Sequence, residues 1–552
     1  MVKGKIANVL KEAVREAQTR ELLPPVTLPD IVVERPQSAA HGDYACSFPL
    51  KLARIMGLNP LEIARRVASL ITPLPEVEKA EIARPGFINF TLRSDWLARE
   101  VEVIRRAGRD YRNVDLGHGQ KVQVEFVSVN PTGPLHVGHG RGAILGDTLA
   151  SVLAASGYSV QREYYLNDAG GQIDAFYRSL YARYQQALGR LADIPDDGYR
   201  GDYVVELARE IVAEQGDALV GMPEKEAVTE IGRIGLGKII GSIRADLETI
   251  GVGFDVWFSE RSLYDGGQYD QALSLLRARG CVMEREGAVW FASSDLGDDK
   301  DNVLVRTNGA PTYFASDVAY HYNKFVQRQF DRVINIWGAD HQGHVRRMKA
   351  VLGALDIDPA RLQIIITQMV TLKRGGVEFR LSKRSGDMIT LREVVEEVGA
   401  DACRFVFLSR SADSQMDFDL ELAKRESADN PVYYVQYAHA RIASIMRLAA
   451  ERNIDFSQGD VTLLVTEPEL SLIRKMIQLP EVVEIVATSL EPHHLPHYAQ
   501  ELATSFHGFY KDCRVISDDE ALTAARLKLV DAARIVLSGT LSLMGMSVPE
   551  RM

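Results

Sequence analysis

The stretch EFVSVNPTGPLHVGHG, residues 125–140, places two histidines, His136 and His139, and three glycines where an extended segment turns into a helix. Residues 121–127 alternate polar and apolar side chains, as a half-buried strand does, and residues 141–154 have apolar positions at helical spacing. The motif is therefore predicted at a strand-to-helix turn. The first backbone N–H groups of such a helix lack internal partners and carry the positive end of its dipole, so they favour a phosphate.

Other interpretations of the two histidines remain open at this point. H-x-x-H is also a metal-ligand spacing, and a second copy at residues 341–344 follows Asp340 directly, so a metallohydrolase is one alternative. A purely structural role for the histidines is another. The flanking glycines favour a phosphate cradle, because Gly133, Gly138 and Gly140 would let a ligand approach the backbone closely.

Composition sets limits on the class of protein. A chain of 552 residues exceeds what one hydrophobic core supports, so three or four domains are expected. No apolar run reaches transmembrane length and no signal-peptide core is present, which predicts a cytoplasmic protein without a membrane partner. The net charge of −11 gives no global footprint for nucleic acid, so a polyanion would have to meet local basic patches.

The pattern of strands and helices changes along the chain. From about residue 120 it becomes strand-helix-strand, and parallel-type strands return at residues 332–337 and 363–367. The fold class is therefore predicted as α/β, with a Rossmann-type parallel-sheet catalytic domain between an N-terminal α+β domain and an all-helical C-terminal domain. The predicted boundaries are 1–112, 113–400 with a helical insertion at about 170–300, a connecting segment at 401–430, and 431–552.

A second basic element follows the strands. The loop FRLSKRSGD, residues 379–387, comes shortly after a Lys-Arg-Gly-Gly sequence. If this loop and the histidine turn meet at the carboxyl ends of a parallel sheet, a triphosphate could lie between them. Lys383 would then offer a compact cation to the leaving phosphates.

These two elements carry a resemblance to a known family. HVGH resembles the HIGH motif, and RLSK the KMSK motif, of class I aminoacyl-tRNA synthetases, in the same order and at a similar separation. Within that class, arginyl-tRNA synthetases are the most similar, through the stretches EFVSVNPTGPLHVGHGRGA, YYLNDAGGQ, PTYFASDVAYH, WGADHQGHV, GADACRF, GMSVPERM, HGDYACSFPLKLA and RPGFINFTL. The resemblance covers nearly the whole chain.

The resemblance implies an arginine–tRNA ligase. Such an enzyme uses ATP to convert L-arginine to arginyl-adenylate and then transfers arginine to the 2′-hydroxyl of the terminal adenosine of tRNA(Arg). It also implies magnesium bound to the ATP, without a permanent protein-bound metal. A monomer is expected. By resemblance, His136, His139 and Lys383 are catalytic, while the nucleotide contacts are Gly138, Gly338, Asp340, Ser382 and Lys383.

The arginine site is also implied by resemblance. Asp317 would face the guanidinium, since a planar cation pairs best with a bidentate anion. Asp317 could instead cap a helix after Ser316. The other implied contacts are Tyr313, His136, Asn130 for the α-amino group, Glu125 to shape the pocket, and either Gln342 or His341.

One departure from the family concerns the position just upstream of HVGH. Many arginyl-tRNA synthetases carry a lysine there and lack the second lysine of KMSK, whereas this chain has Gly133 and keeps Lys383. Arg380 replaces the first lysine of KMSK. These features predict Lys383 as the principal contact to the leaving group.

The flanking domains acquire expected roles from the same resemblance. Residues 1–112 would contact the D-loop corner of the tRNA, and the C-terminal helices would read the anticodon. Tyr433, Tyr437 and Arg441, with neighbouring Tyr434 and His439, could stack on splayed bases or contact phosphates. Tyrosines at helical spacing are also typical of a protein core.

Two further functions compete with the ligase. A small-molecule nucleotidylyltransferase can also carry an H-x-G-H turn, and a catalytically silent relative could bind RNA alone. Nucleotidylyltransferases are usually shorter and lack a long helical C-terminal module, so length favours the ligase.

Overall fold

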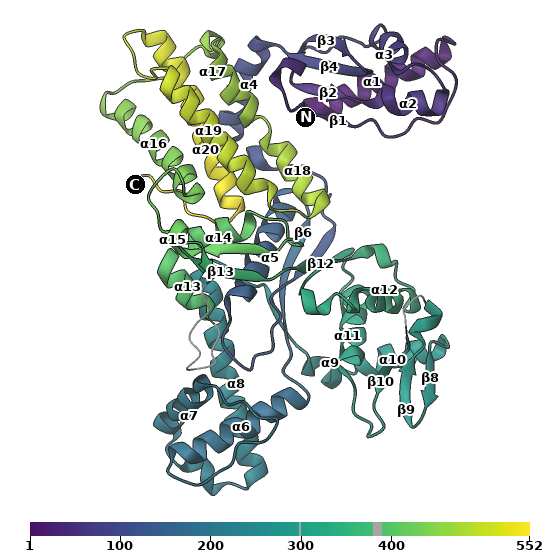
Figure 1. Cartoon of the computed structure of the whole chain (residues 1–552), viewed down its shortest axis with the longest axis vertical. Helices are drawn as coiled ribbons and strands as arrows, with labels where there is room; N and C mark the ends of the chain where they lie inside the picture. Colours follow the sequence, from purple (N-terminus) through teal and green to yellow (C-terminus); the bar gives the residue numbers. More distant parts are fainter. Residues whose placement is uncertain (297–299, 379–388) are drawn as a thin grey trace.

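The structure is a computed structural model of the chain, and it describes residues 1–296, 300–378 and 389–552 (Figure 1). Among these residues, no helix is both long enough and apolar enough to cross a membrane. The chain forms an N-terminal α+β unit, a central parallel sheet with attached modules, and a C-terminal helical bundle, which confirms the predicted fold class (Figure 1).

The N-terminal unit is a four-stranded antiparallel sheet covered by helices. Its strand order is β1-β2-β4-β3. A long helix, α4, leaves this unit and packs against α17 and α20 of the C-terminal bundle. The elements are α1 (Val2–Thr19), β1 (Val33–Glu34), β2 (Tyr44–Cys46), α2 (Phe48–Met56), α3 (Pro60–Ala68), β3 (Val77–Ala83), β4 (Phe87–Leu92) and α4 (Ser94–Ala107).

The central sheet has five strands, all parallel, in the order β12-β11-β5-β6-β7. The chain moves outward from β5 through β6 to β7 and then returns to the other side of β5, so the strand order reverses between β5 and β11. A ligand crevice is expected at the carboxyl ends of strands that flank such a reversal. The strands are β5 (Lys121–Glu125), β6 (Ser159–Leu166), β7 (Val256–Ser259), β11 (Arg332–Gly338) and β12 (Leu362–Thr367).

The expected helical insertion at about 170–300 is only partly helical. It begins with three helices, but β7 within it joins the central sheet, and β8 and β9 form an antiparallel sheet with β10. β7 is only four residues long, too short to show an alternation, and Glu286 and Gly287 make the β8–β9 turn with positive φ. The elements are α6 (Gly171–Ala187), α7 (Asp202–Gln215), α8 (Glu224–Thr249), α9 (Arg261–Asp265), α10 (Gln268–Ala278), β8 (Val282–Arg285), β9 (Ala288–Phe291), β10 (Asn302–Val305), α11 (Tyr313–Tyr322) and α12 (His344–Ala354).

A small third sheet follows the central one. β13 pairs with β14 and, in parallel, with β15, so part of the expected connecting segment at 401–430 is sheet and helix. The basic loop, residues 379–387, follows β14 in the sequence and lies entirely outside the described residues. The elements are β13 (Val370–Arg374), β14 (Val377–Glu378), α13 (Leu391–Val398), α14 (Ala400–Leu408), β15 (Met416–Asp419) and α15 (Leu420–Ala423).

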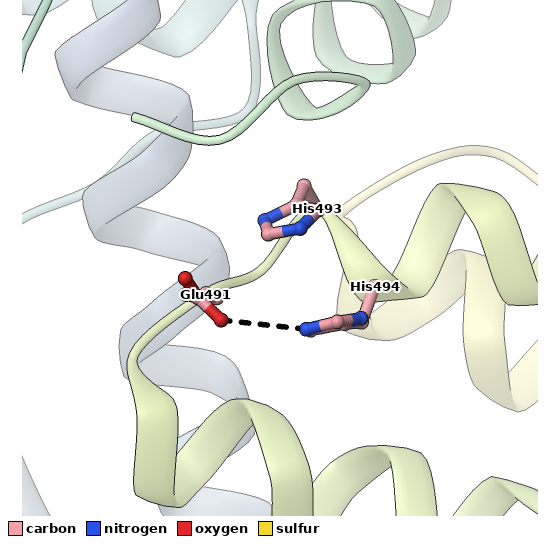
Figure 2. Close-up of side chains that lie close together, drawn as sticks. All are labelled: Glu491, His493 and His494. Atoms are coloured by element: carbon pink, nitrogen blue, oxygen red, sulfur yellow. Dashed lines mark ion pairs between the residues drawn. The ribbon is translucent and has the colours of Figure 1, made fainter. Parts of the chain in front are cut away.

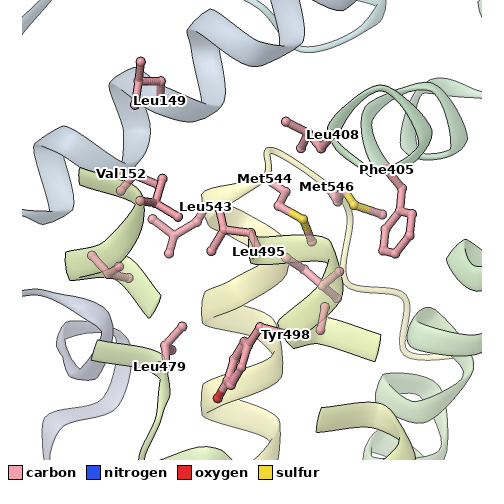
Figure 3. Packing of buried hydrophobic residues seen from close by; sticks show 14 of the residues in the cluster. Leu149, Val152, Phe405, Leu408, Leu479, Leu495, Tyr498, Leu543, Met544 and Met546 are labelled. Atoms are coloured by element: carbon pink, nitrogen blue, oxygen red, sulfur yellow. The ribbon is translucent and has the colours of Figure 1, made fainter. Parts of the chain in front are cut away.

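The C-terminal bundle packs on the catalytic domain through a shared apolar core. Side chains of α5 (Val137–Ala155), α14, α18, α19 and α20 meet there, including Leu149, Phe405, Leu495 and Met544 (Figure 3). α5 is buried over nearly its whole length, as expected for a helix that is apolar on all sides. The bundle helices are α16 (Pro431–Glu451), α17 (Glu467–Met476), α18 (Leu479–Ser489), α19 (His494–Asp512) and α20 (Glu520–Leu543).

One buried cation joins three segments at this junction. The side chain of Arg404, on α14, is 1% exposed and forms an ion pair with Asp147 of α5. Its guanidinium also donates to the carbonyl oxygens of Ile250, at 2.5 Å, and Met544. Gly545 has φ of +68°, and a Cβ there would collide with the guanidinium. Arg404 therefore fixes the junction by satisfying one carboxylate and two carbonyl groups.

We expect Arg404→Met to lower the free energy of unfolding by about 3–5 kcal/mol, because it leaves a buried carboxylate without its main partner. Urea titration followed by circular dichroism measures the change. The double variant Arg404→Met/Asp147→Leu should regain part of the loss, and Arg20→Met, at the exposed residue just after α1, serves as the control. An Arg404→Met variant as stable as the control would contradict this role.

Candidate active site

The two histidines of the HVGH turn cap α5 reciprocally. His136 is the N-cap residue, and its Nδ1 accepts from the Gly138 N–H at 3.1 Å. The Nδ1 of His139 accepts from the His136 N–H at 3.3 Å, and the two ring centroids are 3.4 Å apart. Because both Nδ1 atoms act as acceptors, each neutral ring carries its proton on Nε2. The turn therefore offers two Nε2–H donors.

Burial keeps these rings uncharged. It lowers the pKa of His136, and burial together with the neighbouring His136 lowers the pKa of His139 to about 3. At neutral pH the pair consequently acts through neutral hydrogen-bond donors rather than cations. The positive potential at this turn comes from the dipole of α5.

The expectation that free backbone N–H groups would bind a phosphate here is wrong for the first turn of α5. The Val137 N–H donates to the Ile389 carbonyl, at 3.3 Å, the Gly138 N–H to the His136 ring, and the His139 N–H to the His136 carbonyl, at 3.0 Å. These donors are occupied because a histidine serves as the N-cap. An anion at this turn would be met by side-chain N–H groups and the helix dipole.

Two of the glycines are required by packing. A Cβ on Gly138 would lie 3.0 Å from Cε1 of His136, so glycine leaves room for the ring that caps the helix. A Cβ on Gly140 would lie 2.6 Å from Cδ1 of Leu391, so this glycine allows α13 to approach α5. A Cβ on Gly133 would make only ordinary contact with Tyr203, at 3.5 Å.

The second H-x-x-H pair lies at the end of β11. Gly338 ends this strand, and the exposed Asp340, His341 and Gln342 follow it. A Cβ on Gly338 would lie 2.6 Å from Oδ1 of Asp340, so glycine permits this turn. Within the described ranges, neither H-x-x-H pair belongs to a group of three metal-ligand side chains, and no metallohydrolase centre is formed there.

Buried charged side chains form a layer between the strands β5, β6 and β11 and the end of α11. Lys324 is fully buried and donates to Glu125 at the end of β5, at 2.5 Å, and to Asn335 of β11, at 3.0 Å. Glu163 of β6 pairs with Arg328 and accepts from the Tyr320 hydroxyl at 2.5 Å. Each of these two carboxylates therefore has a cationic partner.

Two other carboxylates have a raised pKa. Burial, with repulsion from Glu125 and Glu260, raises the pKa of Asp317 on α11 to about 7, although Lys324 and Arg347 oppose the shift. Burial also raises the pKa of Glu260, at the end of β7, to about 7. Two carboxylates whose negative charge is poorly compensated are typical of a site that binds a cation.

Asp317 follows Ser316 in α11, and Ser316 and Glu260 line an open cavity. Its volume is about 810 Å³, and its lining includes Glu260, Gln172, Tyr313 and Ser316. Asp317 is the neighbour of Ser316 within α11, whose N-cap is Thr312, so the alternative of Asp317 as a helix cap is wrong. The cavity therefore combines aromatic, amide and acidic groups.

A strained segment after β5 carries Asn130 to the side chain of Gln172, which lines this cavity. Val127 and Ser128 have φ of +66° and +43°, which is unfavourable for residues with a side chain and especially for a β-branched one. The Oγ of Ser128 accepts from the Tyr165 N–H at 3.1 Å, which ties the segment to β6. The Asn130 amide donates to the side chain of Gln172, at 2.6 Å.

The other predicted site residues lie on α16 of the C-terminal bundle or outside the described residues. Ser382 and Lys383 are outside them. Tyr433 and Tyr437 stack on α16 with centroids 5.8 Å apart, and the Arg441 guanidinium lies over the rings of Tyr437 and Tyr510.

Glu260 and Lys324 are two charged residues of this site that the sequence analysis missed. Glu260 ends an unrecognised short strand, and Lys324 lies on a π-helical turn that follows α11. The only available signal for Glu260 was an acidic residue after the apolar run Val-Trp-Phe.

A parallel sheet with a capped histidine turn at its strand reversal, an acidic pocket beside it and a helical bundle behind it defines a class I aminoacyl-tRNA synthetase. Comparison with protein families agrees. Residues 3–92 match the arginyl tRNA synthetase N-terminal domain, residues 100–442 the catalytic domain of class I (R) tRNA synthetases, and residues 435–552 the DALR anticodon-binding domain.

The particular family follows from individual relatives. The arginine–tRNA ligase of Dehalococcoides mccartyi strain CBDB1 is 58% identical over 100% of this chain and 99% of its own length, and that of Carboxydothermus hydrogenoformans is 50% identical over 94% of each. The chain belongs to the arginyl-tRNA synthetase family. This confirms the resemblance and the assignment as an aminoacyl-tRNA ligase, and the alternative of a small-molecule nucleotidylyltransferase is not supported.

Solved structures show the same architecture. A putative arginyl-tRNA synthetase of Campylobacter jejuni has 33% identity and a TM-score of 0.77 over 84% of this chain and 100% of its own. The arginyl-tRNA synthetase of Thermus thermophilus, at 23% identity, has a TM-score of 0.80 over 100% of both chains, which supports the fold.

The raised pKa of Asp317 predicts a pH-dependent stability difference. Its carboxyl is uncharged in both states below about pH 4, whereas the folded protein must ionise a partly buried group as the pH rises through about 7. The stability it contributes is therefore present at low pH and lost on the alkaline side. Between pH 4.5 and pH 8, the free energy of unfolding of Asp317→Asn should therefore rise by on the order of 2 kcal/mol relative to that of wild type.

Urea unfolding at the two pH values measures this difference. Asp174→Asn, at an exposed acid of the same cavity, is the control and should follow wild type at both pH values. If the free energy of unfolding changed by the same amount in Asp317→Asn and in wild type across this pH range, the carboxyl would already be ionised without cost.

Proposed function

We propose that the acidic pocket beside α11 binds the guanidinium of arginine through Asp317 and Glu260. The observation that carries this proposal is the pair of carboxylates whose pKa is raised to about 7 with incomplete compensation. A guanidinium supplies a permanent planar cation with several donors, which pairs with carboxylates better than a point charge does. Binding arginine would lower both pKa values and relieve their mutual repulsion.

The remaining contacts to arginine surround this pair. Tyr313 lines the cavity and packs at its entrance, with a side chain that is 45% exposed. Asn130 is bonded to Gln172, which lines the cavity, and is proposed to meet the α-amino group. Either Gln342 or His341 completes the amino-group site from the end of β11.

The HVGH turn is proposed to hold the phosphates of ATP. His136 and His139 each present a neutral Nε2–H, and these donors sit at the positive end of the α5 dipole. Gly338 and Asp340, at the end of the adjacent β11, are proposed to meet the adenosine. Ser382 and Lys383 are assigned to the triphosphate from the sequence, and Mg²⁺ enters with the nucleotide.

The reaction then needs positioning and charge stabilisation. The arginine carboxylate attacks the α-phosphorus of ATP, the bond from this phosphorus to pyrophosphate breaks, and arginyl-adenylate forms. The 2′-hydroxyl of the terminal adenosine of tRNA(Arg) then attacks the arginyl carbonyl, and AMP leaves. No step requires a covalent bond to the enzyme. The neutral histidines can strengthen their hydrogen bonds as charge moves onto the phosphate oxygens.

Arginine-dependent ATP–pyrophosphate exchange, with and without tRNA, tests this function. Asp317→Asn and Glu260→Gln should each raise the KM for arginine by at least about 30-fold, which corresponds to about 2 kcal/mol for a lost charged contact. Citrulline provides a sharper comparison, because it replaces the guanidinium by a neutral urea of similar shape. The variants should lose most of the wild-type preference for arginine over citrulline.

Asp174→Asn is the matched control for this experiment and should change the arginine KM by less than about threefold, since its carboxylate is exposed. Absence of arginine-dependent exchange even with cognate tRNA would contradict the function. Exchange with an unaltered arginine preference in both pocket variants would contradict the assignment of the pocket.

The outer face of α16 is proposed to bind tRNA. Tyr433, Tyr437 and Arg441 are partly exposed there, and Tyr510 of α19 extends the same surface. His439 instead points inward, with its ring bonded to the Pro549 carbonyl. The D-loop contact of residues 1–112, a cytoplasmic location and a monomeric state are proposals that rest on the sequence and the family resemblance.

Separate Tyr437→Ala and Arg441→Ala substitutions test this surface. A stacked base contributes about 1–3 kcal/mol, so the KM for tRNA should rise by about 5- to 100-fold while the melting temperature stays unchanged. Tyr434→Ala is the contrasting variant, since Tyr434 packs against the hydrophobic core and its loss should lower the melting temperature. A lower melting temperature with an unchanged tRNA KM would show that Tyr437 is a core residue.

A further inference from the structure

A cluster of metal-ligand side chains lies in the short connection between α18 and α19, outside the pocket described above. Leu490 ends α18 in the left-handed conformation, with φ of +61°, and the next residues are Glu491, Pro492, His493 and His494. His493 is the N-cap of α19. This abrupt turn brings one carboxylate and two imidazoles together (Figure 2).

The geometry of the three side chains suits a single ion. One ligand atom from each lies within 4.8 Å of the others, and the Glu491 carboxylate is 3.5 Å from Nε2 of His494. The rings of His493 and His494 stack with centroids 4.4 Å apart. Ligand atoms on a tetrahedral zinc ion are about 3.4 Å apart, so small side-chain rotations would complete the site.

A second observation points to a missing partner. The Nδ1 atom of His493 is buried and has no hydrogen-bond partner among the residues that the structure describes. A buried ring nitrogen without a partner is costly, and a metal ion would satisfy a nitrogen of this ring and set its tautomer. The first H-x-x-H pair shows the contrast, because the Nδ1 atoms of His136 and His139 are already engaged in capping α5.

We propose that Glu491, His493 and His494 bind one divalent transition-metal ion of the zinc type. Imidazole nitrogen with a single carboxylate suits Zn²⁺, whereas Mg²⁺ and Ca²⁺ prefer oxygen ligands. Three protein ligands leave a fourth position for water. The bound ion cross-links the end of α18 to the start of α19.

The site lies where the bundle meets the catalytic domain. The neighbouring His497 approaches the Ser409 carbonyl, just beyond α14, with its Nε2 at 3.2 Å, and α18 packs against α5. An ion held in this turn therefore stabilises the junction by mass action, because it binds the folded turn and not the unfolded chain. This role does not depend on how the pocket binds arginine.

Calorimetric titration of the full chain with Zn²⁺, after removal of metals with a chelator, tests the proposal. Wild type should bind one more equivalent of Zn²⁺ than His493→Ala/His494→Ala, or bind that equivalent at least about tenfold more tightly, since ligand loss costs at least as much as loss of supporting contacts. Added Zn²⁺ should raise the melting temperature of wild type more than that of the double variant. Zinc X-ray absorption should report two imidazole nitrogens.

His118→Ala is the matched control, because His118 and Asp115 form an exposed pair of potential ligands elsewhere. It should bind Zn²⁺ as wild type does. Equal stoichiometry and affinity in wild type and the double variant would overturn the proposal, provided that the metal-free melting temperatures match. If the double variant melts lower without metal, Glu491→Gln provides the second comparison, and unchanged Zn²⁺ affinity in it would also overturn the site.

Discussion

Burying the ammonium group of Lys324 between β5 and β11 determines the charge of the pocket above it. This group satisfies Glu125 and Asn335, on the two strands that flank the reversal of the sheet, and lies 4.0 Å from the centre of the Tyr320 ring. The charge of Glu125 is thereby compensated inside the protein. The less compensated negative charge is left to Asp317 and Glu260, so the position of one lysine bears directly on where the proposed cationic substrate would bind.

Helix α5 connects this site to the rest of the molecule. Its first turn holds the two histidines, its middle pairs with Arg404 through Asp147, and its last turns enter the core shared with the bundle (Figure 3). Because the helix is buried along nearly its whole length, it can shift only with the elements packed around it. The phosphate-facing turn and the anticodon-type bundle are therefore parts of one packed structure.

The sequence revealed the elements whose signal is local. An alternating strand followed by H-x-G-H and an apolar helix located β5, the turn and α5, and the strands at β11 and β12 were recognised from their apolar runs. It missed β7 and the β8–β9 hairpin, whose four-residue strands are too short for a periodic pattern. Glu260 and Lys324 escaped detection because their roles depend on which strands become neighbours. The occupied N–H groups of α5 were also missed, because composition does not indicate a histidine N-cap.

The pocket is built from features that disfavour the folded state on their own. Val127 and Ser128 occupy left-handed backbone conformations, and Asp317 and Glu260 lie where ionisation is costly. Contacts from β6 and the buried layer hold these features in place, so the surrounding fold supplies the stability that they remove. A cationic substrate reverses the electrostatic part of this penalty when it binds. In the proposed function, affinity for arginine and the instability of the empty pocket are thus two consequences of the same uncompensated charge.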